Sequence, residues 1–243
     1  MRAILMYHSI DGSGSPISVD RGTFARHVAW LASGAVRVVP LAELLAGGTD
    51  DAVALTFDDA FENFATDAAP LLAERGLPVT LFVVSGQVGG TNDWGGRPQR
   101  SVPTLPLLSW DALGELAEQG VELGAHTRTH RALDGLADAE VEEELGSCAA
   151  ELVARTGRRP TSFAYPYGRM SPVAVAAARG HYAVSCTTEL RALRAGEDPA
   201  RVPRLDAYYF RAPGQLERWG SGRLARYLWV RSHARRVRRT FAR

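Results

Sequence analysis

Lysine is absent from this chain, so all 28 basic residues are arginines. Together with the abundant alanine, this absence indicates a coding bias and carries no functional meaning. Only two cysteines occur, Cys148 and Cys186, and both lie in apolar surroundings without C-x-x-C spacing. We expect buried free thiols and no disulfide, which fits a reducing compartment.

Long apolar runs are also missing. No stretch of 18 apolar residues exists, so no membrane span is expected. The first apolar stretch, residues 2–7, is too short for the apolar region of a signal peptide, and repeats and Gly-rich phosphate loops are lacking. These absences predict a cytoplasmic protein, and no nucleic-acid partner is expected.

What is present suffices for a full core. The chain has 243 residues, 46% of them hydrophobic and 23% charged. A chain of this size and composition needs no more than one large domain. We expect a barrel over residues 1–217 and a basic, helical tail over residues 218–243.

Charge divides the chain unevenly. Residues 218–243 hold nine of the 28 arginines and no acid, which leaves 19 arginines against 27 acids in the rest. A solvated terminal helix explains the basic tail, and so does contact with an anionic membrane surface. The second explanation would place the protein at the inner membrane face.

Short apolar runs without alternation recur along the chain, as expected for strands buried on both faces. They cover residues 3–7, 53–57, 79–84, 121–125, 162–165, 182–186 and 202–205. Helical patterns lie between most of them, with Asp20 and Ser109 as N-caps and Val141, Leu145 and Leu152 on one helical face. This alternation predicts a parallel α/β architecture, with a barrel preferred over an open sheet.

Two strand ends carry residues suited to metal chemistry. Asp58 and Asp59 follow one predicted strand, and His126 and His130 follow another. Carboxylate and imidazole are ligands for a catalytic Zn²⁺, and three protein ligands leave one position open for water. A solvated loop with a surface histidine pair is the alternative, but both pairs would lie on the same rim of a parallel sheet.

Three motifs now point to a known family. Thr56-Phe57-Asp58-Asp59, His126-Thr127-Arg128-Thr129-His130 and Phe163-Ala164-Tyr165-Pro166-Tyr167-Gly168 resemble the first three motifs of the polysaccharide deacetylase family, also called the NodB-homology fold. The resemblance covers roughly residues 1–210. It implies a distorted (β/α)7-type barrel with the active site at the carboxyl ends of the strands.

The resemblance also implies roles for these residues. Asp59, His126 and His130 would bind a divalent metal, expected to be Zn²⁺ with Co²⁺ or Ni²⁺ as alternatives. Asp58 would be the general base, and the backbone N–H of Tyr167 would help to hold the tetrahedral oxyanion.

Two family features are missing here. Alanine occupies position 164, where the family usually has an arginine that orients the base, and no late Leu-x-x-His supplies the acid. The Tyr7-His8 pair instead resembles the poly-N-acetylglucosamine deacetylase branch, whose circularly permuted barrel begins with the acid-bearing strand. His8 is therefore the expected general acid, and Arg204 is the expected substitute for the missing arginine, with Asp206 as its partner or as a residue that shares the role.

Other expectations concern the substrate and two further positions. Trp94, in the Gly-rich loop 86–100, is expected to stack on a sugar ring, and Tyr165 and Pro166 are the other expected substrate contacts. His27 is expected on the surface of its helix. Ala60 replaces a common family glycine, and its Cβ argues against a left-handed turn there.

The function expected from these residues is metal-dependent hydrolysis of an N-acetyl group on an amino sugar, a glycan or a glycoconjugate. A hydrolase of another small amide, such as a deformylase, would use the same site. A non-catalytic sugar-binding pseudoenzyme is the third possibility, but a structural metal needs no spare base such as Asp58.

Overall fold

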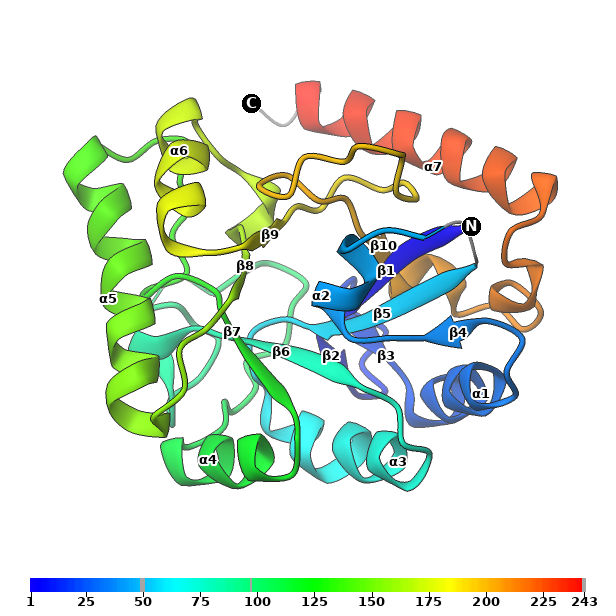
Figure 1. Cartoon of the computed structure of the whole chain (residues 1–243), viewed down its shortest axis with the longest axis horizontal. Helices are drawn as coiled ribbons and strands as arrows, with labels where there is room; N and C mark the ends of the chain where they lie inside the picture. Colours follow the sequence, from blue (N-terminus) through cyan, green and yellow to red (C-terminus); the bar gives the residue numbers. More distant parts are fainter. Residues whose placement is uncertain (49–50, 97, 242–243) are drawn as a thin grey trace.

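The computed structural model describes residues 1–48, 51–96 and 98–241. Its centre is an eight-stranded parallel sheet in the order β10-β1-β5-β6-β7-β8-β9, with β4 also paired to β5 (Figure 1). The strands are β1 (Arg2–Tyr7), β4 (Arg37–Val38), β5 (Ala52–Phe57), β6 (Val79–Val83), β7 (Glu122–Ala125), β8 (Ser162–Ala164), β9 (Val184–Cys186) and β10 (Leu205–Asp206). Six of the seven predicted strands are present with small differences at their ends. The seventh, predicted at 202–205, is represented by an isolated bridge at Val202 and by β10, which shares only Leu205 with the prediction.

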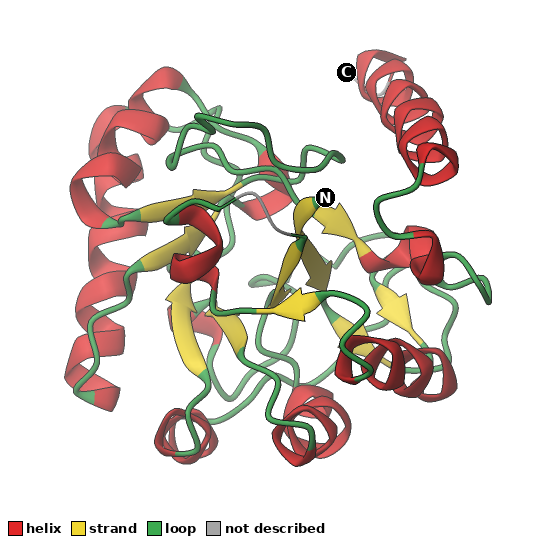
Figure 2. Ribbon diagram, turned by 45° about the vertical axis from the view of Figure 1, so that its right-hand side comes forward, coloured by secondary structure: helices red, strands yellow, loops and turns green. Residues whose placement is uncertain are grey.

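The sheet curls until its two edges meet. At one edge, Cys186 of β9 forms a parallel bridge with Val202, and at the other edge Leu205 and Asp206 pair with β1. Residues 202–206 therefore connect both edges and complete a distorted barrel, which confirms the expected fold. Figure 2 shows the curled strands with helices around them.

Helices lie outside the sheet, as parallel strand connections require. They are α1 (Arg21–Ala32), α2 (Leu41–Leu45), α3 (Ala69–Glu74), α4 (Trp110–Glu118), α5 (Asp138–Thr156), α6 (Pro172–His181) and α7 (Gly222–Phe241). Asp20 and Ser109 accept hydrogen bonds from backbone N–H groups in the first turns of α1 and α4, as predicted.

The predicted helical faces are buried, with one correction. Val141, Leu145 and Leu152 of α5 are at most 1% exposed. His27 of α1 was expected on the surface but is 5% exposed, with hydrogen bonds to the Tyr7 hydroxyl and to the Phe210 carbonyl. Burial lowers the pKa of His27. It lies one turn from Phe24 and Leu31, so helix geometry turns it toward the core.

Both cysteines are buried free thiols, as predicted. Burial raises the pKa of Cys148 to about 11 and that of Cys186 to about 12. Neither thiol is therefore a nucleophile at neutral pH.

The basic tail forms α7, and its first half packs on the barrel. Leu224 is fully buried and Leu228 is 5% exposed, whereas Trp229 and Val230 are 62% and 50% exposed. The side chains of residues 236–243, on which part of the tail prediction rests, lie outside the described residues. Within the described chain, no helix combines the length and the apolar character needed to cross a membrane.

Candidate active site

The predicted residues meet at the carboxyl ends of the parallel strands. Tyr7 of β1 lies beside Phe57 of β5 in the sheet register, so His8 and Asp58 follow as neighbours. His8 Nε2 is 3.7 Å from Asp58 Oδ2. His126 follows β7, two strands away from β5, and the third motif follows β8.

Asp59, His126 and His130 form a compact, buried group of ligand atoms. Asp59 Oδ1 is 3.4 Å from His126 Nε2 and 3.2 Å from His130 Nε2, and the three donor atoms lie within 4.8 Å of one another. Asp59 Oδ1 is buried without a hydrogen-bond partner in the described part of the chain. A divalent cation suits this donor set, since it would satisfy that oxygen and accept both imidazole nitrogens.

The other nitrogen of each imidazole is already engaged. His126 Nδ1 donates to the Ala164 carbonyl at 2.6 Å, and His130 Nδ1 lies 2.9 Å from the Tyr167 hydroxyl. These contacts orient both rings so that Nε2 faces Asp59, the arrangement that metal-binding histidines commonly show. Alanine at position 164 thus contributes its carbonyl, although it lacks the side chain of the usual family arginine.

Charge and burial oppose each other in this group. Burial disfavours the Asp59 carboxylate, but His130 and His126 outweigh it and hold its pKa well below the usual range. Burial also lowers the pKa of His130. For His126 burial acts in the same direction, yet the Asp59 and Asp58 carboxylates raise its pKa overall. The raised pKa makes His126 easier to protonate, and a divalent cation that binds to this group would displace that proton.

Backbone strain is concentrated here. Seven non-glycine residues in the described chain have positive φ, and all but Ser101 lie at this site: Asp59, Ala60, Trp94, Thr127, His130 and Tyr167. Ala60, at φ 57°, contradicts the expectation that its Cβ would avoid a left-handed turn. The surrounding contacts compensate for such strain, which is typical of functional sites.

Helix α5 supplies one of those contacts. The Glu144 carboxylate, 5% exposed, accepts hydrogen bonds from the backbone N–H of Thr129, at 2.8 Å, and from the Thr129 hydroxyl. The Thr127 hydroxyl in turn accepts from the N–H of His130. The loop that carries both histidines is thereby fixed to the helix that follows it.

Arg204 binds Asp58 from the interior of the barrel. Its Nη1 and Nη2 donate to the two Asp58 oxygens at 2.6 and 2.8 Å, and its Nε donates to the Thr187 carbonyl. Arg204 is fully buried. Burial opposes ionisation of Asp58, but the Arg204 guanidinium and the neighbouring histidines lower its pKa overall. Asp58 is therefore a carboxylate at neutral pH. In the described structure the ion-pair partner of Arg204 is Asp58, and the alternative pairing of Arg204 with Asp206 is not observed.

A cavity of about 300 Å³ opens onto these groups. His8, Asp58, Asp59, His126, His130, Trp94 and Tyr167 line it, with Asn92 and Gln99 of the loop 86–100. Other lining residues were not indicated by the sequence, among them Ile17, Thr188 and Arg235. These additional residues belong to loops and to the distant α7. No spacing in the sequence connects them to the motifs.

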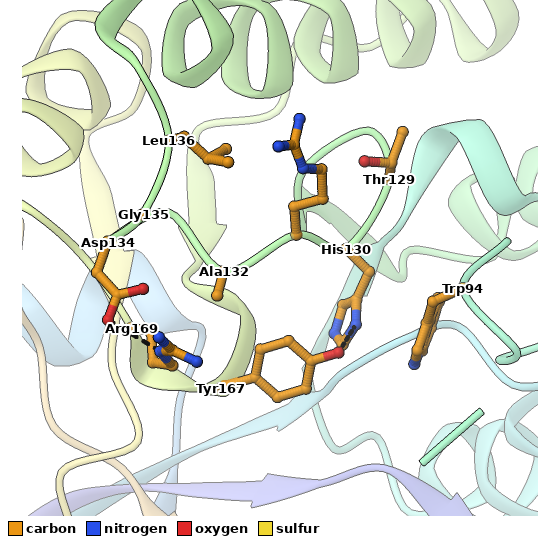
Figure 3. Close-up of a pocket in the computed structure, with 10 residues that line it drawn as sticks. Trp94, Thr129, His130, Ala132, Asp134, Gly135, Leu136, Tyr167 and Arg169 are labelled. Carbon is orange, nitrogen blue, oxygen red and sulfur yellow. Dashed lines mark hydrogen bonds and ion pairs between the residues drawn. The ribbon is translucent and has the colours of Figure 1, made fainter. Parts of the chain in front are cut away.

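Trp94 lines this cavity but also packs on a metal ligand. Its ring stacks on the His130 ring with the centroids 3.9 Å apart. A second cavity, of about 270 Å³, continues past His130, Trp94 and Tyr167 toward Asp134 and Arg169. Figure 3 shows the Tyr167 hydroxyl directed at His130, with Trp94 on the other side of that histidine.

Two expected substrate contacts do not reach the cavities. Tyr165 has no exposed surface, and its hydroxyl donates to the Ala200 carbonyl at 2.9 Å. Pro166 is buried as well and lines neither cavity. Tyr165 instead packs on Phe163 in the core, and Pro166 begins the turn over Pro166–Gly168 that carries Tyr167.

Comparison with known proteins identifies the family. Residues 46–183 match the model of the family described as polysaccharide deacetylase. The chain belongs to the polysaccharide deacetylase family. The match covers more than half of the chain and includes all three motifs that carried the resemblance.

Individual relatives agree with this assignment. YxkH of Bacillus subtilis (strain 168) is 27% identical over 193 residues, 76% of this chain and 64% of YxkH. The poly-β-1,6-N-acetyl-D-glucosamine N-deacetylase of Staphylococcus aureus (strain MRSA252) is 25% identical over 63% of this chain and 55% of that enzyme. The chain thus spans less than two thirds of the length of either relative.

A solved structure supports the fold. IcaB from Ammonifex degensii superimposes with a TM-score of 0.72 and 26% sequence identity, covering 85% of this chain and 93% of IcaB. The distorted barrel expected from the resemblance is therefore also the fold of a related protein.

The metal group can be tested by ligand removal. We expect Asp59→Ala, His126→Ala and His130→Ala each to lose bound divalent metal after dialysis, because each removes one of three ligand atoms. His181→Ala, which removes a histidine bonded to Glu142 on the surface, should keep the metal. Elemental analysis of the four variants measures this, and stoichiometric metal in all three ligand variants would refute the assignment.

Arg204→Met should shift the pH dependence of the site. Without the guanidinium, burial dominates and raises the pKa of Asp58, so the acidic limb of kcat/KM should move to higher pH. A buried charge without its partner should also lower the free energy of unfolding at neutral pH by about 3–5 kcal/mol.

The sign of that stability effect can be checked separately. In the wild type the depressed pKa makes ionised Asp58 stabilising above its unfolded-state pKa, and this contribution is lost as the pH falls through the lower folded-state pKa. Denaturant titrations should accordingly show a smaller difference between Arg204→Met and wild type in acid. A constant difference at all pH values would mean that Arg204 acts only by packing.

Proposed function

We propose that this chain is a metal-dependent N-deacetylase that hydrolyses the acetamido group of an amino sugar within a glycan or a glycoconjugate. One observation supports this proposal above all others: a carboxylate outside the metal group, Asp58, is held ionised by Arg204 next to that group. A metal that served only the fold would need no such base.

The chain's own residues account for the proton transfers. When bound by Asp59, His126 and His130, a divalent metal would polarise the amide carbonyl and make water more acidic. Asp58 takes a proton from the attacking water as the new C–O bond forms. His8, which lies 3.7 Å from Asp58 and lines the cavity, gives a proton to the nitrogen as the C–N bond breaks. Acetate and the free amine are the products.

Tyr167 contributes to the proposal through its backbone. Its φ of 60° turns the peptide at the edge of the cavity, and its hydroxyl fixes His130. An N–H directed at the developing oxyanion would stabilise it, an effect worth about 3–4 kcal/mol for a single donor in other enzymes.

The substrate class in this proposal comes from the relatives. The staphylococcal relative is named for the removal of N-acetyl groups from poly-β-1,6-N-acetyl-D-glucosamine. Hydrolysis of a formamide or another small amide would use the same residues and is the alternative. A panel of N-acetylated sugars and oligosaccharides, assayed for released acetate and for released formate from N-formyl analogues, separates the two.

Two substitutions distinguish the base from the acid. Asp58→Asn should keep the metal and lower kcat by about 10² to 10⁴, because an amide cannot accept the proton of water. His8→Ala should lower the rate and remove the alkaline limb of the pH profile, since an acid must be protonated to act. Near-normal activity of Asp58→Asn would exclude it as the base, and an unchanged pH profile in His8→Ala would place the acid elsewhere.

Location at the inner membrane face stays a prediction, which α7 now makes more specific. Leu224 and Leu228 belong to the core, so removing the whole tail would also remove core packing. Among the tail residues whose side chains the structure describes, Trp229 and Val230 are the exposed large apolar residues that could enter a membrane surface.

Cosedimentation with vesicles of anionic lipid tests this contact. Full-length protein should bind at low salt and much less at high salt, because arginines near the surface act by charge. The double variant Trp229→Ser and Val230→Ser should bind less at low salt while its thermal unfolding stays unchanged. Absence of vesicle binding by the full-length chain would rule the membrane contact out.

A further inference from the structure

Helix α7 reaches the catalytic cavity through Arg235. This arginine lines the cavity together with His8 and Asp58, although it lies 177 positions after Asp58 (235 − 58) and 227 after His8 (235 − 8). Its Nη1 is 3.7 Å from Asp206 Oδ2, at the end of β10 and next to β1. The C-terminal segment therefore adds a cation to the wall of the cavity.

The hydrogen-bonding capacity of Arg235 is not filled within the described structure. Nη1 has no hydrogen-bond partner there, since the contact with Asp206 is longer than a hydrogen bond. The side chain is 23% exposed and its guanidinium also lies 5.7 Å from the Tyr209 ring centroid. Arg204, by contrast, is fully buried and uses both terminal nitrogens on Asp58. Nη1 itself is buried, so a ligand in the cavity would meet the part of the guanidinium that is exposed. Among the arginines that the structure describes, Arg235 is the one that lines this cavity.

Arg235 also stands at the junction with another cavity. A groove of about 480 Å³ runs between α7 and residues 188–194, and it shares Thr188 and Arg235 with the catalytic cavity. Its apolar lining includes Met1, Leu190, Ala225, Leu228 and Trp229. On the far side of Arg235 from the metal group, therefore, the catalytic cavity continues into a groove with an apolar wall.

Other charged residues also line the groove, among them Arg194 and Glu189, and Glu189 is paired with Arg191. The guanidinium of Arg194 makes no ion pair among the residues that the structure describes. Arg191, in the same segment, is already paired in a bidentate manner with Glu197. An uncharged polysaccharide would leave the donors of Arg235 and the apolar wall without matching partners.

We propose that Arg235 is a specificity-determining residue that binds a phosphate attached to the amino sugar undergoing deacetylation, and that the groove holds an apolar chain esterified to that phosphate. This inference rests on the proposed function and names its substrate class: an N-acetylated glycosyl phosphate ester of an apolar alcohol. A planar guanidinium with free N–H donors suits a phosphate, which it can bind through two oxygens.

Three substrates separate the elements of this proposal: an N-acetylglucosamine oligomer, N-acetylglucosamine 1-phosphate, and the decyl ester of that phosphate. For the wild type, we expect kcat/KM to rise in this order. Arg235→Ala should lower kcat/KM for both phosphates by about 10- to 100-fold, mainly through KM, because hydrogen bonds to charged groups are worth that much. Its effect on the oligomer should stay below about threefold.

Two further variants serve as controls. Arg235→Lys keeps the charge without the two-pronged geometry and should retain part of the preference for phosphate. Arg158→Ala removes an equal charge at an exposed position just beyond α5 and should change none of the three rates.

The groove is tested by filling it. Ala225 is exposed on α7 and lines the groove, so Ala225→Trp should obstruct the groove without disturbing the core. It should lower kcat/KM for the decyl ester alone, while activity on the 1-phosphate stays unchanged. A kcat/KM for the decyl ester equal to that of the wild type would overturn the assignment of the apolar chain to the groove.

Other outcomes would overturn the role of Arg235. Equal losses on all three substrates in Arg235→Ala would show that Arg235 acts through Asp206 on the catalytic groups. A wild type without preference for the phosphates would exclude the proposed substrate class.

A binding measurement keeps this inference separate from the proposed function. If the wild type hydrolyses none of the substrates, the proposed function fails, and calorimetric binding of decyl phosphate still decides the role of Arg235. Binding by the wild type that weakens about tenfold or more in Arg235→Ala supports that role. Equal binding by both proteins, or none by the wild type, overturns it.

Discussion

A buried ion pair between Asp58 and Arg204 is the interaction on which the site depends. It joins the end of β5 to the segment that completes the barrel at β10, so the catalytic carboxylate is held by a residue nearly 150 positions away. A guanidinium removed from water needs a bidentate carboxylate to offset its loss of hydration, and Asp58 supplies it. The segment that closes the barrel therefore also carries the arginine that keeps the proposed base ionised.

In the metal group, too, residues from neighbouring strands hold the functional side chains in place. Each histidine uses one nitrogen on a neighbour from the β8 segment, the Ala164 carbonyl or the Tyr167 hydroxyl, and directs the other toward Asp59. The left-handed backbone at Asp59, His130 and Tyr167 is strained for side chains with a Cβ. Buried contacts such as the one between Glu144 and Thr129 hold this geometry in place of the glycines that would otherwise permit it.

Sequence reasoning succeeded where a local pattern carried the information. Apolar runs located the strands, caps located the starts of α1 and α4, and three motifs located the family. It failed where burial depends on neighbours from elsewhere in the chain. His27 was expected on the surface of its helix but bonds to Tyr7 and Phe210, and Tyr165 was expected at the substrate but bonds to the Ala200 carbonyl in the core. The short β4 was missed because two residues, Arg37 and Val38, leave no periodic pattern.

By itself, the sequence determined the strand and helix order, the metal-ligand types and the presence of a spare carboxylate, because each depends on residues close together in the chain. The resemblance already pointed to Arg204 as the arginine of the site, and the tertiary structure decided that it pairs with Asp58 through both oxygens, that Leu224 belongs to the core, and that Arg235 lines the catalytic cavity. These contacts join residues that are separated by more than a hundred positions or by several elements. No spacing encodes them, since they arise only when the sheet curls and its edges meet.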